Sequence, residues 1–320
     1  MDADLERFMA AIAWEQANAA EEIVCDYVET LIERFANLVL TMEGGDRGRA
    51  LSMLNEAGGG SVLVARLSWP PISRTLLGRA PDGSWPGDMS PTPERIVPRM
   101  PPLMRCVGWL ETDLGKRGWR PHEVLATSRL AEAFALLGTC GPDVEDFVSL
   151  CTRVIVPLRA PDGVLGSWSS DEWIGCTVLV NHDNIQHPAL LAEQLVHEAV
   201  HHCQAMVESR KPFIIRPELA NRSERYPSPW TGAPLTAKSL IGACAVWFSI
   251  VHFWLRAQDH VDAAIVEAGK HRAIRGFEGS ELQRYLADFR WALDADVPDL
   301  VSAMRDNLLG KQRQLPRPRA

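Results

Sequence analysis

The chain has 320 residues, of which 46% are apolar, so it can bury the core of one large domain or two small ones. Its formal net charge of -8, with acidic and basic residues mixed along the chain, argues against a general nucleic-acid binder, which would carry a basic face. Seven cysteines form no Cys-x-x-Cys pair, and the start MDADLERF lacks a basic segment followed by an apolar run. These features favour a cytoplasmic protein with reduced thiols.

The N-terminal part is predicted to be helical. Apolar residues recur at helical spacing over residues 2–42, and Gly44-Gly45 ends this pattern, which predicts two or more helices. Nine prolines between residues 68 and 104 are poorly compatible with a helix or a central strand, so we expect a long irregular loop there. Helical spacing returns over residues 121–138. We group residues 1–130 as an N-terminal helical region with a Pro-rich loop.

Strand-type sequence is concentrated between residues 153 and 181. The run RVIVPL is followed by a Pro-Asp-Gly turn and by two further runs, VLGSWSS and GCTVLVN. This pattern predicts a short hairpin or a small mixed sheet. Pro188 suits the first position of the helix that follows, and an apolar stripe then runs from Leu191 to Val207.

The C-terminal part is predicted to be helical again. Residues 240–255 (LIGACAVWFSIVHFWL) are fewer than the roughly 20 that cross a membrane, so they predict a buried helix. Helical stretches near 258–273 and 280–309 precede a basic tail that we expect to be disordered. The predicted fold is mainly α with a small β-sheet (α+β). A zincin-like helix-sheet core at 131–257 has helical additions at both ends, 1–130 and 258–320.

The segment LVHEAVHHCQ contains a His-Glu-x-x-His motif formed by His197, Glu198 and His201. On a helix, residues i and i+4 lie on one face, where a single divalent ion can bridge two imidazoles. A small sheet followed by a strongly patterned helix is also the context in which zincin-type sites are built. The motif therefore predicts a metal site, and the competing interpretation is a polar helix face with two solvated histidines.

A catalytic metal usually needs a third protein ligand. The pattern His-Glu-x-x-His-x-x-Gly-x-x-His is excluded, because neither Gly nor His stands at the required offsets. The next predicted helix contains no carboxylate over residues 239–255, so His252 is the first candidate for the third ligand and Glu218 the second. His202 has the wrong helical phase.

Three arginines are candidates for anion binding. Arg256 follows His252 by one turn, where a guanidinium would clamp the distal carboxylate of a dicarboxylate co-substrate. A salt bridge at the helix end is the simpler explanation for this residue. Arg216 and Arg225, in the loop between the two helices, are candidates to hold the same co-substrate or a carboxylate of the substrate.

Residues 145–256 contain, in order, a Val-Pro-Leu strand, a Ser-rich turn, Leu-Val-His-Glu, and a Pro-Trp loop before an apolar helix that ends Phe-Trp-x-Arg. In this order and spacing they resemble the HExxH-motif peptide-modification proteins of natural-product gene clusters, which are iron-requiring, 2-oxoglutarate-dependent peptide β-hydroxylases. The resemblance implies that His197 and His201 bind Fe(II) and that Glu198 is a site residue. It does not extend to Gly242 and Ala243, where family members carry polar residues, so it supplies no third ligand.

The metal decides what Glu198 does. Beside Fe(II), two imidazoles and one further ligand leave three coordination positions for 2-oxoglutarate and dioxygen, and Glu198 orients a ligand or coordinates. Beside zinc, Glu198 would be the general base on a bound water. If no third protein ligand exists, a halide could take its place, and chlorination becomes a variant of the same chemistry.

The sequence thus predicts an Fe(II)/2-oxoglutarate-dependent oxygenase that hydroxylates an unactivated carbon of a peptide or amino-acid-derived substrate in natural-product biosynthesis. The substrate is either free or presented by a carrier or leader segment. The alternatives are a zinc metallopeptidase with a divergent third ligand and a non-catalytic peptide-binding module. We expect neither nucleic acid nor a membrane as partner, and the oligomeric state is left open.

Overall fold

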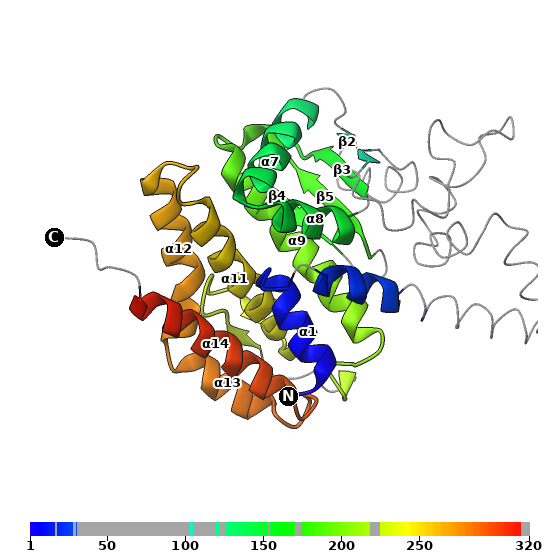
Figure 1. Ribbon diagram of the computed structural model, residues 1–320, viewed down its shortest axis with the longest axis vertical. Coiled ribbons are helices and arrows are strands. Elements are labelled where there is room, and N and C mark those ends of the chain that lie inside the picture. Colours follow the sequence, from blue (N-terminus) through cyan, green and yellow to red (C-terminus); the bar gives the residue numbers. More distant parts are fainter. Residues whose placement is uncertain are drawn as a thin grey trace, which may run out of the picture.

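A computed structural model describes residues 1–16, 18–27, 30, 103–104, 120–121, 126–152, 154–169, 174–217 and 225–314. Within these ranges the chain is mainly helical, with two small sheets (Figure 1). Several predicted features lie outside the described residues. They are the helical pattern after residue 30, nearly all of the Pro-rich loop, Glu218 and the C-terminal tail.

The helices are α1 (Ala3–Ile12), α7 (Ala126–Cys140), α8 (Pro142–Cys151), the 3-10 helix η3 (His182–Asn184), α9 (Pro188–Glu208), α11 (Ala237–Ala257), α12 (Ala263–Glu278), α13 (Glu281–Phe289) and α14 (Val297–Gln314). The strands are β1 (Leu103–Met104), β2 (Arg120–Pro121), β3 (Val154–Arg159), β4 (Gly166–Trp168), β5 (Cys176–Val180), β6 (Tyr226–Pro227) and β7 (Pro234–Leu235). Residues 19–27 are also helical, so the prediction of at least two N-terminal helices is confirmed.

The larger sheet is mixed and has the strand order β1-β3-β5-β4, with β2 pairing β3. β3 runs parallel to β1 and β5, whereas β4 is antiparallel to β5. Every residue of β5 is buried, which means that both faces of the sheet are covered at this strand. The prediction of a small mixed sheet between residues 153 and 181 is confirmed. The second sheet pairs β6 with β7 in the loop before α11.

Two long helices, α9 and α11, form the centre of the molecule. Pro188 occupies the first turn of α9, and the side chain of His187 caps that helix by accepting a hydrogen bond from the Ala189 N–H. The helices pack antiparallel, because Trp254 near the end of α11 bonds Glu193 near the start of α9, whereas Gly242 lies beside Gln204. Figure 1 shows α11 between α9 and α12.

α11 is long and apolar enough to cross a membrane by length and composition, but 83% of its most apolar window is buried in the structure. Its buried side chains pack against α9, α12 and α14. The prediction of a buried helix is therefore confirmed, although the helix has 21 residues and extends beyond the predicted range at both ends.

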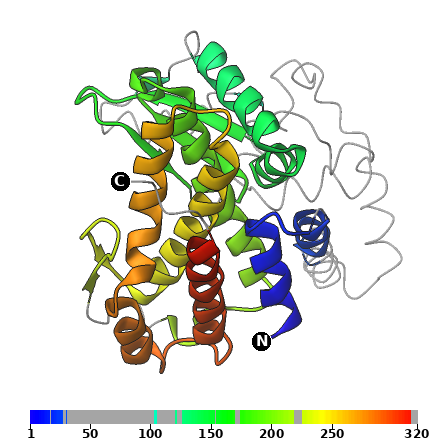
Figure 2. The same cartoon turned by 60° about the vertical axis from the view of Figure 1, so that its left-hand side comes forward.

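The C-terminal helices surround α11 and meet the N-terminus. The stretch predicted as one helix over 280–309 is divided into α13 and α14, because the segment between them pairs with another loop. There Asp294 N donates to Phe213 O at 2.9 Å, and Leu293 forms a β-bridge with Ile214. Figure 2 shows α1 beside α14, so the two ends of the described chain pack together.

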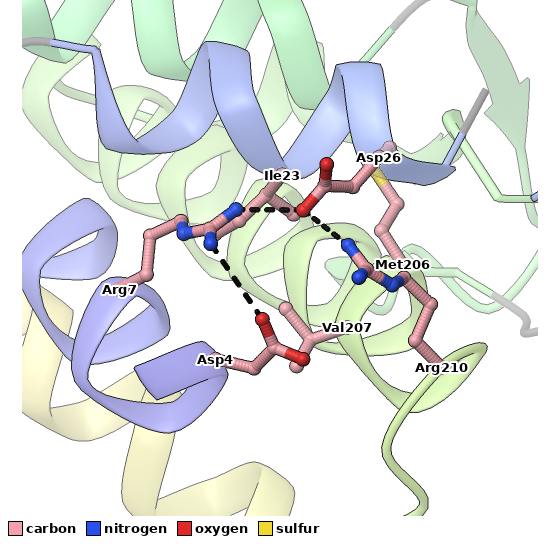
Figure 3. A pocket seen from close by; sticks show the side chains of 7 residues that line it. All are labelled: Asp4, Arg7, Ile23, Asp26, Met206, Val207 and Arg210. Atoms are coloured by element: carbon pink, nitrogen blue, oxygen red, sulfur yellow. Dashed lines mark hydrogen bonds and ion pairs between the residues drawn. The ribbon is translucent and has the colours of Figure 1, made fainter. Parts of the chain in front are cut away.

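A cluster of charged side chains ties the N-terminal helices to the end of α9 (Figure 3). Arg7 Nη1 donates to Asp26 Oδ2 at 2.6 Å, and Arg210 of the residues after α9 forms an ion pair with the same carboxylate oxygen. Arg7 also lies 3.5 Å from the carboxylate of Glu22 and 3.7 Å from that of Asp4. One acidic side chain, Asp26, thus joins two basic ones from distant parts of the sequence.

Candidate metal centre

The two motif histidines lie one turn apart on α9 and face each other. The ring centroids of His197 and His201 are 5.0 Å apart, with an angle of 67° between the ring planes. Although 35% of the His197 side chain is exposed, desolvation of the ring lowers its pKa below the ordinary value. The imidazole of His197 is therefore neutral near pH 7, which is the form that binds metals.

Glu198 brings a carboxylate to the same place. Its side chain is 2% exposed, and its Oε1 lies 3.9 Å from His197 Nε2. This distance is too long for a hydrogen bond, so Glu198 does not orient His197 directly. The carboxylate can instead accept a hydrogen bond or a proton from a group bound next to His197.

His202 faces away from this pair. Its Nε2 lies 3.2 Å from Thr177 Oγ1 of β5, and the side chain is buried. Burial lowers the pKa of His202 to about 3, and neighbouring His201 adds to the effect. The prediction that His202 has the wrong helical phase for the site is confirmed, and the residue links α9 to the sheet.

Among the described residues His252 forms no group of metal-binding side chains with the two motif histidines, and its role as third ligand stays a prediction. The ring of His201 lies against Gly242, and His252 is ten residues further along α11, about 15 Å at the rise of an α-helix. His252 packs against Phe248, and its Nδ1 is 3.4 Å from Lys311 Nζ of α14. The sequence shows that His252 lies on an apolar helix, but not that α14 covers it.

Arg256, the first of the predicted arginines, is held by other partners. Arg256 donates to Asp143 Oδ1 at 2.8 Å and to Trp14 O at 2.9 Å, so it ties α11 to α8 and to the N-terminal segment. The simpler explanation of Arg256, a salt bridge at the helix end, is the one that the structure shows. Arg216 and Arg225 are exposed, and they adjoin the undescribed residues 218–224.

The donor set fits a metal held by two imidazoles. Among the residues that the structure describes, no group of three His, Cys, Asp or Glu side chains could hold a metal ion. His197 and His201 can each offer one imidazole, with the Glu198 carboxylate beside them. Further ligands would then come from bound small molecules, which an octahedral Fe(II) centre accepts.

One feature near the site was not predicted from the sequence. A cavity of about 190 Å³ adjoins His201, between the second half of α9 and the first turns of α11. In the sequence, Gly242 stands where the family that residues 145–256 resemble carries a polar residue. The absence of a side chain at Gly242 was the signal for this cavity.

In comparisons with known proteins, no protein-family model matches the chain, and a search of curated proteins finds no significant match.

Proposed function

We propose that the protein is an Fe(II)/2-oxoglutarate-dependent oxygenase that hydroxylates an unactivated carbon of a peptide or amino-acid-derived substrate. The observation that carries the proposal is the pair of imidazoles on α9, whose centroids are 5.0 Å apart, with a buried carboxylate beside them. The resemblance of residues 145–256 to iron-dependent peptide β-hydroxylases supports both the choice of metal and the substrate class.

His197 and His201 would hold the iron, which together with 2-oxoglutarate and dioxygen supplies the oxidising power to replace a C–H bond by C–OH. The two side chains are suited to this because they share one face of a helix that is packed on both sides. Glu198 would fix the orientation of a neighbouring bound molecule by accepting a hydrogen bond. His202 holds α9 against β5 and so keeps the two imidazoles in register with the sheet.

The number of protein ligands does not by itself separate this chemistry from zinc-dependent hydrolysis. Catalytic zinc sites normally use three protein ligands and one water. The described residues offer two imidazoles in one place, and α11 contains neither Asp nor Glu. A facial-triad iron centre also uses three protein ligands, two imidazoles and one carboxylate, so the resemblance of residues 145–256 is what favours iron over zinc.

The proposal is tested by an anaerobic titration of the metal-free protein with Fe(II) and 2-oxoglutarate, followed by visible absorbance. We expect the weak charge-transfer band of a chelated keto acid in the wild-type protein and its loss in His197→Ala and His201→Ala. His260→Ala is the matched control, because it removes an exposed histidine from the turn after α11 and should leave the band unchanged.

Other outcomes would replace the proposal. Tight zinc binding without the band, together with hydrolysis of unstructured peptides that requires Glu198, would identify a metallopeptidase. Binding of peptides without dependence on either motif histidine would identify a peptide-binding module.

A further inference from the structure

The cavity next to His201 continues the candidate metal centre along the groove between two helices. It is lined by residues of the two turns of α9 that follow His201 and by the first turns of α11. Its volume of about 190 Å³ is several times the roughly 30 Å³ that one water occupies in the liquid. It therefore has room for a group of several non-hydrogen atoms.

Gln204 gives this cavity its chemical preference. The side chain is 5% exposed, and its Nε2 donates to Glu208 Oε1 at 2.5 Å. The opposite orientation of the amide would place Oε1 against the carboxylate, so Glu208 fixes which end of the amide faces the cavity. The carbonyl oxygen of Gln204 is buried and has no hydrogen-bond partner among the described residues. A buried acceptor of this kind requires a donor.

Gly242 keeps the cavity open between Gln204 and the metal centre. A Cβ atom at this position would lie 3.3 Å from His201 Cε1 and 3.7 Å from Gln204 Oε1. Any larger side chain would fill the space that both groups border. The Gln204 carbonyl and the ring of His201 thus both lie next to the open space at Gly242.

The charges at the cavity favour a neutral ligand. Glu208 and Lys238 both line it, and their formal charges cancel. A ligand of either sign would be attracted by one of these side chains and repelled by the other. A neutral group with an N–H donor meets the requirement of Gln204 without an unfavourable charge contact.

We propose that this cavity binds an amide group of the substrate peptide, with the amide N–H donating to Gln204 Oε1. The cavity would then place the peptide alongside His201 and, with it, the carbon to be hydroxylated. The identity of the ligand as a peptide rests on the proposed function, but binding of the amide does not require iron.

The test compares two probes of nearly equal shape on the full-length, metal-free protein. N-methylacetamide carries an N–H, and methyl acetate lacks it. Binding is followed by NMR through the side-chain amide signals of ¹⁵N-labelled glutamines, and the Gln204 signal is identified by its loss in Gln204→Leu. We expect saturable shifts of this signal and at least tenfold tighter binding of the amide than of the ester.

Two variants make the test specific. In Gln204→Leu, which lacks the Gln204 signal, binding is followed through the backbone amide signal of ¹⁵N-labelled Gly242, and this variant should bind both probes equally. Gly242→Leu should bind neither probe, because its side chain fills the cavity. Equal affinity of the wild-type protein for both probes would overturn the proposal, and so would an absence of shifts, which would mean that water alone satisfies Gln204. Because no metal is present, these results are independent of the Fe(II) titration, so either proposal can fail while the other stands.

Discussion

Two buried histidines make the free energy of unfolding depend on pH. Burial lowers the pKa of His202 and of His252 to about 3, with His201 adding to the effect at His202 and Lys311 at His252. In the unfolded chain both pKa values return to about 6.5. Between these two values the unfolded state binds protons that the folded state does not, so stability falls as the pH decreases from about 6.5 towards 3.

We therefore expect His252→Gln to flatten the pH dependence of unfolding. Each buried histidine contributes a slope of up to about 1.4 kcal/mol per pH unit in this window, and the variant lacks one of them. Urea unfolding at pH 7, 6 and 5, followed by tryptophan fluorescence, measures the slope. His260→Gln is the control, because its histidine is exposed. Parallel slopes for the wild-type protein and His252→Gln would show that the folded state accommodates a charged His252.

The histidines also show which part of the site could be predicted from the sequence. Spacing along one helix fixes relative direction, so the pairing of His197 with His201 and the different direction of His202 were both predictable. His252 lies on another helix, and its surroundings depend on how α11 and α14 pack. That packing is a long-range property, so the sequence could not show which side chains surround His252, whereas it could show that His197 and His201 share one face of a helix.

At the scale of elements, α12 approaches its neighbours through two glycines, Gly269 and Gly276, two turns apart. A Cβ atom at Gly269 would overlap the indole of Trp254, and one at Gly276 would overlap that of Trp230. Trp230 Nε1 also donates to Ala273 O of α12 at 2.8 Å. The two indoles therefore pack directly on the backbone of α12, where no side chain fits.

Gly276→Ala should destabilise the protein despite the higher helix propensity of alanine. The added methyl group meets a buried indole, and such overpacking costs roughly 1–3 kcal/mol. Gly310→Ala in α14 is the matched control, because nothing lies within 4 Å of its Cβ position, and it should stabilise by up to about 1 kcal/mol. Guanidinium unfolding of the three proteins measures both effects. A stabilised Gly276→Ala would mean that α12 is not fixed against Trp230.

Helices and strands with a strong sequence pattern and clear boundaries could be predicted. A short helix that directly follows another helix could not. The mixed sheet, α9 and α11 follow from strand composition, Pro188 and a long apolar run. α8 was missed, although Pro142 occupies its first turn and Val144, Phe147 and Val148 form a buried stripe. Only Gly141 separates α8 from α7, so a short helix was hidden between a longer helix and the strand that follows.

At the scale of the whole molecule, buried side chains from α1 to α14 belong to one apolar core. The predicted division of the chain into three regions, with boundaries at residues 130 and 257, stays a prediction. The N-terminal helices pack on α9, and α1 also contacts α11 and α14. The ion pairs of Asp26 add to this apolar packing. They join Asp26 to Arg7 of α1 and to Arg210, which follows α9.

Asp26→Asn should loosen the N-terminal helices selectively. The partners are partly exposed, with 28% of the Arg7 side chain and 41% of the Arg210 side chain accessible, so we expect a loss of about 1 kcal/mol. Hydrogen exchange followed by mass spectrometry should show faster exchange over residues 1–27 and unchanged exchange in α11. Glu267→Gln, which removes an exposed carboxylate from a different ion pair, is the control. A uniform increase in exchange along the chain would mean that the cluster supports the whole fold.

We propose that His197 and His201 form a two-imidazole iron centre from which His252 is absent. X-ray absorption spectroscopy of the Fe(II)-loaded protein tests it most directly, because the scattering pattern reports the number of imidazole ligands. We predict two imidazoles in the wild-type protein and in His252→Gln, and one at most in His197→Ala and His201→Ala. A wild-type spectrum with three imidazoles, or one that is unchanged by His197→Ala, would contradict the claim.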